Sequence, residues 1–319
     1  MITIGMIIDP IDTLQVETDT SLLVIGESNR RQHKVLIATL DDLFIRDGQA
    51  CALWQEISYR SSDENPADTV SDEYISAPMN DCDVILMRQD PPFDLPYLAA
   101  TYILDYAHTE VINNPSALRN ANEKLFTLRF PQFIPTTFVS RDVDEIFKTV
   151  QQKTGQWVLK PLNRKGGEGV FRVTKDYPST PDIINIATHN GNDFIIVQEF
   201  LPAVYQGDKR IFMLEGKPIG WMNRIPPQGE FRANLGLGST AVACDLTERD
   251  NEIIAVVGKA LNEINAPLAG IDIIGDYLSE VNITSPTGLV NMNELSGKKY
   301  EAIFVDYLEK KAAKKGKKS

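Results

Sequence analysis

The first third of the chain alternates short apolar runs with longer segments in which apolar residues recur every three or four positions. The first pattern is typical of buried strands, and the second is typical of helices that pack on a sheet. The expected strands are residues 2–8, 34–39, 83–87 and 110–113, and the expected helices are residues 22–31 and 95–106. Strands and helices in this order predict an α/β fold with a doubly wound parallel sheet.

The chain breaks at Asn114-Pro115-Ser116. Ser116 is a favourable N-cap, so we expect a helix that starts there and continues through Lys124 and Phe126. From about residue 134 the pattern changes to short strands with fewer helices, which predicts mixed sheets with hairpins. The expected strands are residues 136–139, 157–162, 170–173, 194–200, 210–214 and 217–222, and the expected helices are residues 143–152 and 250–264.

Residues 270–286 carry the strongest chemical signal. They read as two short strands joined at Gly275-Asp276, a dipeptide that favours a hairpin turn. Because side chains alternate along a strand, Asp272 faces the same side as Glu280 and Asn282 if the strands fold over each other. Two carboxylates and an amide oxygen that converge with no Lys or Arg between them are suitable ligands for Mg²⁺. A solvated acidic hairpin face is the alternative.

A glycine-rich turn follows the strand that ends near Lys160. Its glycines, Gly166, Gly167 and Gly169, allow backbone N–H groups to approach phosphate oxygens closely. The spacing matches neither a P-loop nor a dinucleotide-binding motif. Most short glycine clusters are hairpin turns, but a lysine on a buried strand needs an anion beside it. The segment therefore indicates a phosphate site, with a plain hairpin as the alternative.

Two further segments have both a functional and a structural interpretation. Gln198-Glu199-Phe200-Leu201 ends a strand between lobes, where free backbone groups could bind a purine edge, and the alternative is a core strand. Asp208 belongs to a polar stretch that, taken alone, is a surface turn.

Residues 225–240 form a long loop punctuated by glycine and proline. Inside a compact lobe such a loop is usually a lid or a disordered segment. Arg224, Arg232 and Asn234 lie beside or within it, so the loop could bind an anion when it closes.

The composition limits the class of protein. A chain of 319 residues with 43% hydrophobic and 24% charged residues is typical of a globular protein with two or three lobes. The net charge of −12 argues against a general nucleic-acid binder. No apolar run reaches membrane-spanning length, and the first residues are typical of a strand instead of a signal peptide. Three scattered cysteines, Cys51, Cys82 and Cys244, indicate a reducing cytoplasm.

In this order the features resemble the ATP-grasp superfamily and, within it, the family of bacterial glutathione synthetases. The motifs Arg-x-Asp-Pro-Pro-Phe-Asp at 88–94 and Asn-x-Thr-Ser-Pro-Thr at 282–287 are specific to that family. The resemblance covers residues 1 to about 288 and departs in the glycine-rich turn and after Thr287. The segments that carry it are residues 6–11, 84–94, 100–104, 122–126, 159–162, 207–210, 224–226 and 285–287.

The resemblance implies an ATP-grasp fold preceded by a doubly wound N-terminal domain. It implies a substrate-binding domain at residues 1–122, a central lobe at 123–202, and a C-terminal lobe at 203–319 with the metal site and the lid. Asp272, Glu280 and Asn282 would hold Mg²⁺, with Mn²⁺ as the alternative metal. The implied ATP site comprises Lys124, Lys160, Gly166, Gly167, Gly169, Gln198, Glu199, Phe200, Leu201 and Asp208.

The implied reaction joins γ-glutamylcysteine to glycine through an acyl phosphate and releases glutathione, ADP and phosphate. Arg210, Arg224 and Arg232 would stabilise the developing charge. The residues implied in substrate binding are Arg88 for the dipeptide, Ser285 and Thr287 for glycine, and Asn234 in the lid. Relatives assemble as dimers or tetramers, so a homo-oligomer is expected, with no nucleic-acid or membrane partner.

Two other functions compete with this one. The first is a different ATP-grasp ligase, which joins another carboxylate to an amine or acts on a protein C-terminus; the motif at 88–94 disfavours it. The second is a non-catalytic nucleotide-binding protein, as in the synapsin-like branch. The intact cluster of Asp272, Glu280 and Asn282, together with Arg210 and Arg224, disfavours the second.

Overall fold

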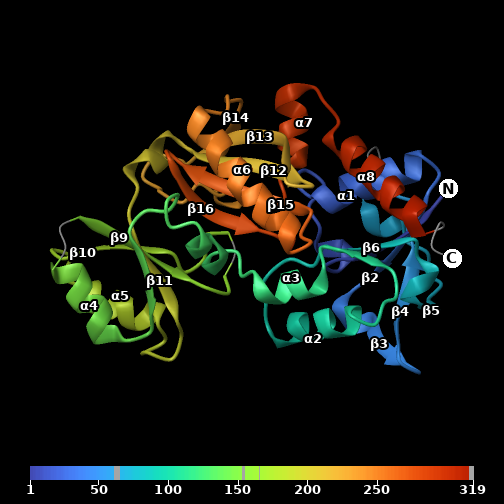
Figure 1. The fold of residues 1–319 in the computed structure, drawn as a ribbon, viewed down its shortest axis with the longest axis horizontal. Coiled ribbons are helices and arrows are strands. Elements are labelled where there is room, and N and C mark those ends of the chain that lie inside the picture. The colour runs from blue at the N-terminus through green and yellow to red at the C-terminus, as the bar shows by residue number, and fades with distance from the viewer. Residues whose placement is uncertain (61–64, 153–154, 165, 316–319) are drawn as a thin grey trace.

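The computed structural model describes residues 1–60, 65–152, 155–164 and 166–315. Three sheets, built from successive parts of the chain, lie beside one another (Figure 1). The first lies at the right of the figure, the second at the left, and the third above and between them. Short 3₁₀ helices occur in several connections: η1 (Ile11–Thr13), η2 (Leu40–Asp42), η3 (Pro66–Thr69), η4 (Met79–Asp81), η5 (Leu125–Arg129), η6 (Pro202–Gln206) and η7 (Leu235–Leu237).

The first sheet has the predicted doubly wound centre, because β2, β1, β6 and β7 are parallel neighbours in that order. Alternate residues of these strands pack against α1 on one face and α2 on the other. Antiparallel β3, β4 and β5 extend the sheet, and the sequence analysis did not predict them. The elements are β1 (Thr3–Ile7), α1 (Thr20–Arg30), β2 (Lys34–Ala38), β3 (Leu43–Arg46), β4 (Gln49–Glu56), β5 (Ile75–Pro78), β6 (Val84–Met87), α2 (Leu95–Leu104) and β7 (Glu110–Ile112).

The helix that follows the first sheet is shorter than predicted and begins differently. Helix α3 (Pro115–Asn120) has Asn114 as its N-cap, and the Asn114 side chain accepts a hydrogen bond from the Ser116 N–H at 2.9 Å. The prediction of Ser116 as the N-cap of a helix through Lys124 was therefore wrong. Pro115 explains the difference, because proline is favourable in the first helical position and so places the cap at Asn114, two residues before Ser116.

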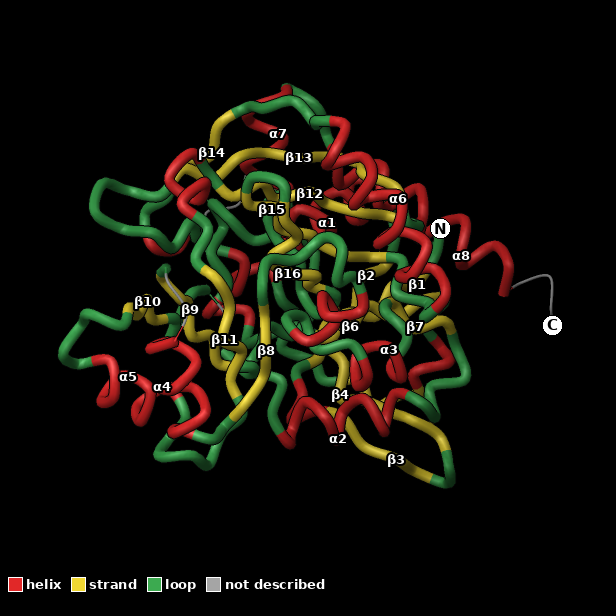
Figure 2. The backbone as a smooth tube through the Cα atoms, turned by 60° about the vertical axis from the view of Figure 1, so that its left-hand side comes forward, coloured by secondary structure: helices red, strands yellow, loops and turns green. Residues whose placement is uncertain are grey.

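The second sheet is small, antiparallel throughout, and has the strand order β10-β9-β11-β8. Helices α4 and α5 pack on one face of it (Figures 1 and 2). The predicted strands and α4 are present, whereas α5 was not predicted. The elements are β8 (Thr137–Ser140), α4 (Val143–Gln152), β9 (Gln156–Pro161), β10 (Phe171–Thr174), α5 (Thr180–Ala187) and β11 (Ile195–Glu199).

The third sheet has the order β14-β13-β12-β15-β16 and is also antiparallel. Its register places Asp272 on β15 opposite Arg210 on β12 and opposite Glu280 on β16. Three side chains from three strands therefore face one another across the sheet. The elements are β12 (Asp208–Leu214), β13 (Lys217–Ile225), β14 (Thr240–Val242), α6 (Glu248–Glu263), β15 (Leu268–Ile274) and β16 (Tyr277–Asn282).

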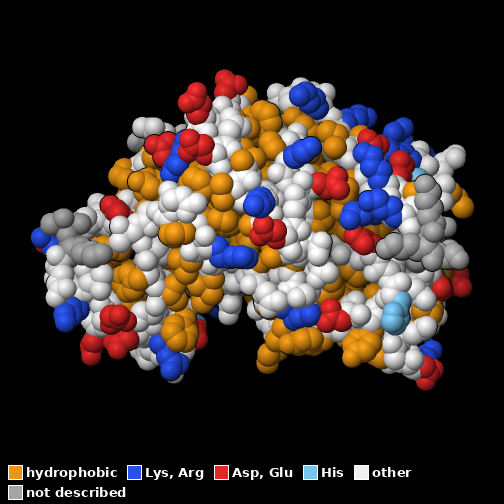
Figure 3. All heavy atoms as spheres, viewed as in Figure 1, with side chains coloured by type: hydrophobic (Ala, Val, Ile, Leu, Met, Phe, Trp, Pro, Cys, Tyr) orange, Lys and Arg blue, Asp and Glu red, His pale blue; other side chains and the backbone are white. Residues whose placement is uncertain are grey.

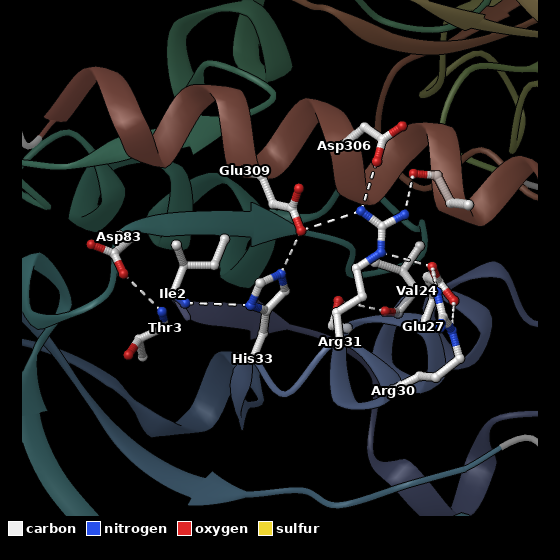
Figure 4. Close-up of polar contacts among 12 residues, drawn as sticks. Ile2, Thr3, Val24, Glu27, Arg30, Arg31, His33, Asp83, Asp306 and Glu309 are labelled. Atoms are coloured by element: carbon white, nitrogen blue, oxygen red, sulfur yellow. Dashed lines mark hydrogen bonds and ion pairs between the residues drawn. The ribbon is translucent and has the colours of Figure 1, made fainter.

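The last two helices, α7 (Leu289–Ser296) and α8 (Tyr300–Lys315), return the chain to the first sheet. Polar contacts attach α8 to α1 and the start of β2 (Figure 4). Arg31 donates to Asp306 at 2.6 Å and to Glu309 at 3.2 Å, and Glu309 also contacts His33 at 2.8 Å. The C-terminal helix is therefore fixed to the N-terminal domain.

Candidate active site

A cavity of about 960 Å³ lies where the three parts of the chain meet, and side chains from all three line it. Of the predicted site residues, Arg88, Lys124 and Gly169 do not line the cavity. The predicted residues that do line it are Lys160, Gly166, Gly167, Gln198, Glu199, Phe200, Leu201, Asp208, Arg210, Arg224, Arg232, Asn234, Asp272, Glu280, Asn282, Ser285 and Thr287.

One end of the cavity is apolar. Val158, Phe200, Val204 and Ala233 form a buried cluster there, and further apolar side chains pack against it. These residues come from the second sheet, the connection to the third sheet, and the loop after β13. A slot with apolar walls beside the end of β11 is suited to a flat aromatic base.

The middle of the cavity contains Lys160. Its ammonium group donates to Gln198 Oε1 at 2.8 Å and to Ser279 Oγ at 3.3 Å, and burial lowers its pKa although Glu280 opposes the shift. Gly166 and Gly167 line the cavity beside it with positive φ values of 66° and 79°, a conformation that exposes backbone N–H groups. This region is therefore suited to a polyanion.

Two predicted phosphate-site residues lie outside the cavity wall. The Lys124 ammonium donates to Glu123 at 2.5 Å and to the Arg164 carbonyl at 2.7 Å, and it lies 3.4 Å from Glu280. A Cβ on Gly169 would lie 3.0 Å from Pro161, so this glycine permits close packing of the turn on β9. In this structure Lys124 places a positive charge beside Glu280, and Gly169 allows the glycine-rich turn to pack on β9.

The acidic hairpin is present, with its turn at Gly275-Asp276 and with Asp272 opposite Glu280. The expectation that no basic side chain lies among these carboxylates was wrong, because other strands supply the cations. Asp272 accepts hydrogen bonds from Arg210 Nε at 2.5 Å and from Arg210 Nη2 at 2.9 Å, and it lies 2.9 Å from Arg224 Nη2.

The charge balance of this cluster follows from its contacts. Burial works against ionisation of Asp272, but Arg210 and Arg224 outweigh it and hold the pKa of Asp272 below its ordinary value. Burial likewise opposes ionisation of Glu280, but Lys124, the hydrogen bond with Glu123 and the charge of Arg210 together lower the pKa of Glu280. Asp208, which accepts from Arg224 at 2.7 Å, has a pKa raised to about 7 by burial and by the charge of Asp272.

Asp272 and Glu280 therefore remain anionic and could bind a cation. The described part of the chain has no group of three or more His, Cys, Asp or Glu side chains placed to hold a metal ion. A metal at this position would therefore use the two carboxylates together with the amide oxygen of Asn282, which lines the same cavity. Carboxylate and amide oxygens are hard ligands, and the set is suited to Mg²⁺.

The loop at residues 225–240 lies over the cavity between β13 and β14. Arg232 pairs with Glu230 at 2.6 Å and donates to the Gly167 carbonyl at 3.4 Å, which joins the loop to the glycine-rich turn. Asn234 Oδ1 accepts from the Gly236 N–H at 2.8 Å and caps η7. Arg224 is not part of the loop, since it is buried within β13.

The far end of the cavity is formed by the N-terminal domain and the segment after β16. Arg88 follows β6 and is only 2% exposed; it donates to Ser21 Oγ at 3.2 Å and to the Pro286 carbonyl at 3.0 Å. The carbonyl of Thr287 accepts from Arg210 at 3.1 Å, and Ser285 and Thr287 line the cavity. Arg88 therefore connects the first sheet to the 285–287 segment.

Comparison with known proteins identifies the family. The sequence matches models of the prokaryotic glutathione synthetase N-terminal domain over residues 2–119 and of the prokaryotic glutathione synthetase ATP-grasp domain over residues 123–297. The chain belongs to the prokaryotic glutathione synthetase family. It is 37% identical over 315 residues to the glutathione synthetase of Buchnera aphidicola subsp. Schizaphis graminum, covering 98% of both chains. It is 40% identical over 291 residues to that of Yersinia pestis, covering 90% of both.

Solved structures show the same fold at low sequence identity. D-alanyl-alanine synthetase A from Vibrio cholerae matches with a TM-score of 0.63 and 16% identity over 98% of both chains. D-cycloserine synthetase DcsG matches with a TM-score of 0.65 and 12% identity, covering 96% of this chain and 99% of the other. The predicted ATP-grasp fold and membership of the glutathione synthetase family are thus confirmed. As a member of this family the chain is an ATP-dependent ligase, and ATP-grasp enzymes use ATP with divalent metal ions.

Surface charge and helix composition bear on the expectations from the sequence. Acidic and basic side chains are interspersed over the face drawn in Figure 3. Among the described residues, no helix is both long enough and apolar enough to cross a membrane.

The sequence analysis missed part of the cavity wall. The apolar slot was not predicted because its residues come from separate segments. One signal was available: Val158 lies two residues from Lys160 on the same strand and therefore on the same face. The N-terminal contribution was also missed. The unpredicted residues that line the cavity include Asp9, Thr18, Asp19, Asp90, Glu123, Val158, Val170, Phe231, Ile274 and Ser279.

Proposed function

We propose that the protein joins γ-glutamylcysteine to glycine with cleavage of ATP to ADP and phosphate, and so makes glutathione: the dipeptide carboxylate takes the γ-phosphoryl group and releases ADP, and the glycine amine then displaces phosphate. The observation that carries this proposal is a single cavity that combines an apolar slot, a lysine beside a glycine-rich turn, an arginine–carboxylate cluster and a wall from the N-terminal domain. Membership of the glutathione synthetase family supports the choice of substrates.

The nucleotide would lie between the second and third sheets, with its base in the apolar slot beside residues 198–201. Lys160 and the backbone of Gly166 and Gly167 would then bind the phosphates. Gln198 supports this arrangement, because its side chain bridges Lys160 and Thr137 and so fixes the ammonium group at the cavity wall. Asp208 would lie beside the ribose of the nucleotide. Lys124, which lies 3.4 Å from Glu280, would add positive charge near the phosphates without lining the cavity.

We propose that the metal is Mg²⁺, with Mn²⁺ as the alternative, and that Asp272, Glu280 and Asn282 would hold it. When bound, the metal supplies positive charge to the transferred phosphoryl group. Hard oxygen donors on adjacent strands and the anionic state of both carboxylates support this assignment.

The reaction would pass through an acyl phosphate formed by the carboxylate of the dipeptide. Arg210 and Arg224 contact Asp272, and both line the cavity. Their positive charges would stabilise the negative charge that develops on the phosphoryl and carbonyl oxygens. Arg232 and Asn234 would act from the lid at 225–240, which keeps water from the acyl phosphate.

The substrates would bind at the N-terminal side of the cavity. We assign residues 1–122 to substrate binding, residues 123–202 to the central lobe and residues 203–319 to the lobe that carries the metal and lid. Arg88 would act on the dipeptide, and Ser285 and Thr287 would bind glycine near the arginine cluster. We further propose that the protein is a cytoplasmic dimer or tetramer with no nucleic-acid or membrane partner.

The test of the proposed function measures ADP and glutathione together. Purified protein with ATP and Mg²⁺ should release ADP in step with glutathione when both γ-glutamylcysteine and glycine are present. Omitting either substrate should reduce ADP release to background. Coupled turnover with a different acid–amine pair and none with these two would retain the ligase and refute the substrates.

A further inference from the structure

We infer that Asp19 binds the α-ammonium group of the γ-glutamyl substrate and thereby selects a dipeptide with a free amino group. This inference rests on the proposed function and adds a specificity-determining residue to it. Asp19 precedes α1 and lines the cavity at the N-terminal side, together with Asp9 and Asp90. Asp19 belongs to the N-terminal domain, whereas the apolar slot is formed by residues 158–233 of the two later parts of the chain.

Asp19 differs from the two neighbouring aspartates in its contacts. Asp9 already accepts hydrogen bonds from the side chain of Gln89 and, at 2.9 Å, from the N–H of Asp90. Asp19 accepts from the N–H of Leu22 at 2.9 Å as the N-cap of α1, and no basic side chain among the described residues forms an ion pair with it. Asp19 thus lies at the cavity wall with no ammonium or guanidinium group of the described residues hydrogen-bonded to it, and such a carboxylate is suited to an ammonium ligand.

Burial raises the pKa of Asp19, and Arg88 is the cation that opposes this shift most. A ligand ammonium group would satisfy the desolvated carboxylate directly. Arg88 offsets the effect of burial only in part, so the Asp19 carboxylate can still bind a ligand cation directly.

A second observation indicates what kind of ligand carries that ammonium group. Two buried polar side chains with unsatisfied atoms lie within electrostatic reach of the aspartates, Arg88 at 2% exposure and Tyr97 at 0%. Within the described part of the chain, Arg88 Nη2 and the Tyr97 hydroxyl have no hydrogen-bond partner. The charges that act most strongly on Arg88 are those of Asp19 and Asp90.

The carboxylate of Asp19 in the cavity wall and the incompletely paired guanidinium of Arg88 beside it are together complementary to a zwitterion. The γ-glutamyl end of the substrate is such a group, because its α-carbon carries both an ammonium and a carboxylate. A ligand with the carboxylate alone would lose the contact with Asp19.

The experiment compares two substrates, γ-glutamylcysteine and glutarylcysteine, in the wild type and in Asp19→Asn. Glutarylcysteine is γ-glutamylcysteine without the α-amino group. We expect the wild type to prefer γ-glutamylcysteine in kcat/KM by roughly ten- to a hundredfold, which corresponds to one charge-assisted hydrogen bond. Asp19→Asn should reduce that preference to within a few-fold, mainly by raising KM for γ-glutamylcysteine, and should leave KM for ATP and glycine unchanged.

Asparagine and serine are both favourable N-caps, so Asp19→Asn and Asp19→Ser should retain α1 and the melting temperature. The matched control is Asp94→Asn, which removes the same charge from the N-cap of α2 outside the cavity wall and should keep the wild-type preference. If both Asp19 variants keep the full preference for the α-amino group, the inference is wrong. If the wild type makes no glutathione, the proposed function fails instead.

Discussion

Asp272 contacts two guanidinium groups through the same carboxylate that we propose as a metal ligand. It lies on the middle strand of three, with Arg210 opposite on β12 and Glu280 opposite on β16. The contacts fix Arg210 and Arg224 near the position where a metal would bind. Asp272 therefore has two roles at this site: it holds the two arginines in place and it is one of the proposed metal ligands.

We predict that Glu280→Gln abolishes ligation without unfolding the protein. The variant keeps the shape of the side chain but removes one of two carboxylates from the proposed metal site, so kcat should fall by roughly a hundredfold or more. Steady-state rates across a range of Mg²⁺ concentrations measure this. Glu263→Gln, on the exposed surface of α6, is the matched control and should keep wild-type rates. Wild-type turnover of Glu280→Gln at moderate Mg²⁺ would refute the metal assignment.

At the scale of elements, the contact between α1 and α8 fixes the end of the chain to its beginning (Figure 4). Glu27 on α1 is 5% exposed and accepts hydrogen bonds from Arg30 at 2.7 Å and Arg31 at 2.8 Å. These contacts lower the pKa of Glu27 from its ordinary 4.5 to about 2. The same Arg31 binds Asp306 on α8, so Glu27 holds the arginine that joins the two helices.

We predict that Glu27→Gln lowers the melting temperature at pH 7. A carboxylate with a lowered pKa in the folded protein contributes stability that is fully present above pH 4.5 and lost as the pH falls towards about 2. The difference between variant and wild type should therefore shrink as the pH falls below 4.5. Thermal melts at several pH values test this, with the exposed Glu73→Gln as control. A difference that stays constant with pH would contradict the prediction.

The loop at 225–240 is the second element with a testable role. We predict that trypsin cleaves after Arg232 rapidly in the protein alone and slowly with ADP, Mg²⁺ and an acyl-phosphate mimic, because the ligands hold the loop closed. Arg224 should resist in both cases, since it is buried in β13. Mass spectrometry of the fragments identifies the site, and Arg232→Gln should remove that fragment. Equal cleavage rates with and without ligands would mean that the loop does not act as a lid.

At the scale of the whole molecule, the cavity exists only because three sheets from successive parts of the chain meet. Arg88 is a direct link between two of them, since it bonds Ser21 of the N-terminal domain and the carbonyl of Pro286 after β16. The proposed dipeptide and glycine sites are therefore joined through one buried side chain.

We predict that Arg88→Ala raises KM for γ-glutamylcysteine much more than KM for ATP. Loss of a charge-assisted hydrogen bond to a carboxylate should cost about 1.5–3 kcal/mol, or about ten- to a hundredfold in affinity. Initial rates with each substrate varied in turn measure the two effects, and a melting curve checks the fold. A variant with weakened ATP binding and unchanged KM for the dipeptide would overturn the assignment of the N-terminal domain.

The sequence by itself determined the parallel centre of the first sheet and the acidic hairpin. Both depend on local periodicity: apolar runs define β1, β2 and β6, and alternation places Asp272 and Glu280 on one face. Residue type and order were also sufficient to group Lys160 with Gly166, and both residues line the same cavity. Family resemblance added the substrates, which periodicity alone does not specify.

Only the tertiary structure decided which residues meet across long separations. The apolar slot joins segments more than 70 residues apart, so no local pattern fixes it, whereas the cap of α3 follows from the adjacent Pro115 and was misjudged at the local level. The cations at Asp272 arrive through the register of β12 and β13, and Asp19 reaches the cavity only because the N-terminal domain packs against the 285–287 segment. Contacts of this kind follow from sheet register and domain packing, which the order of residues along the chain does not reveal.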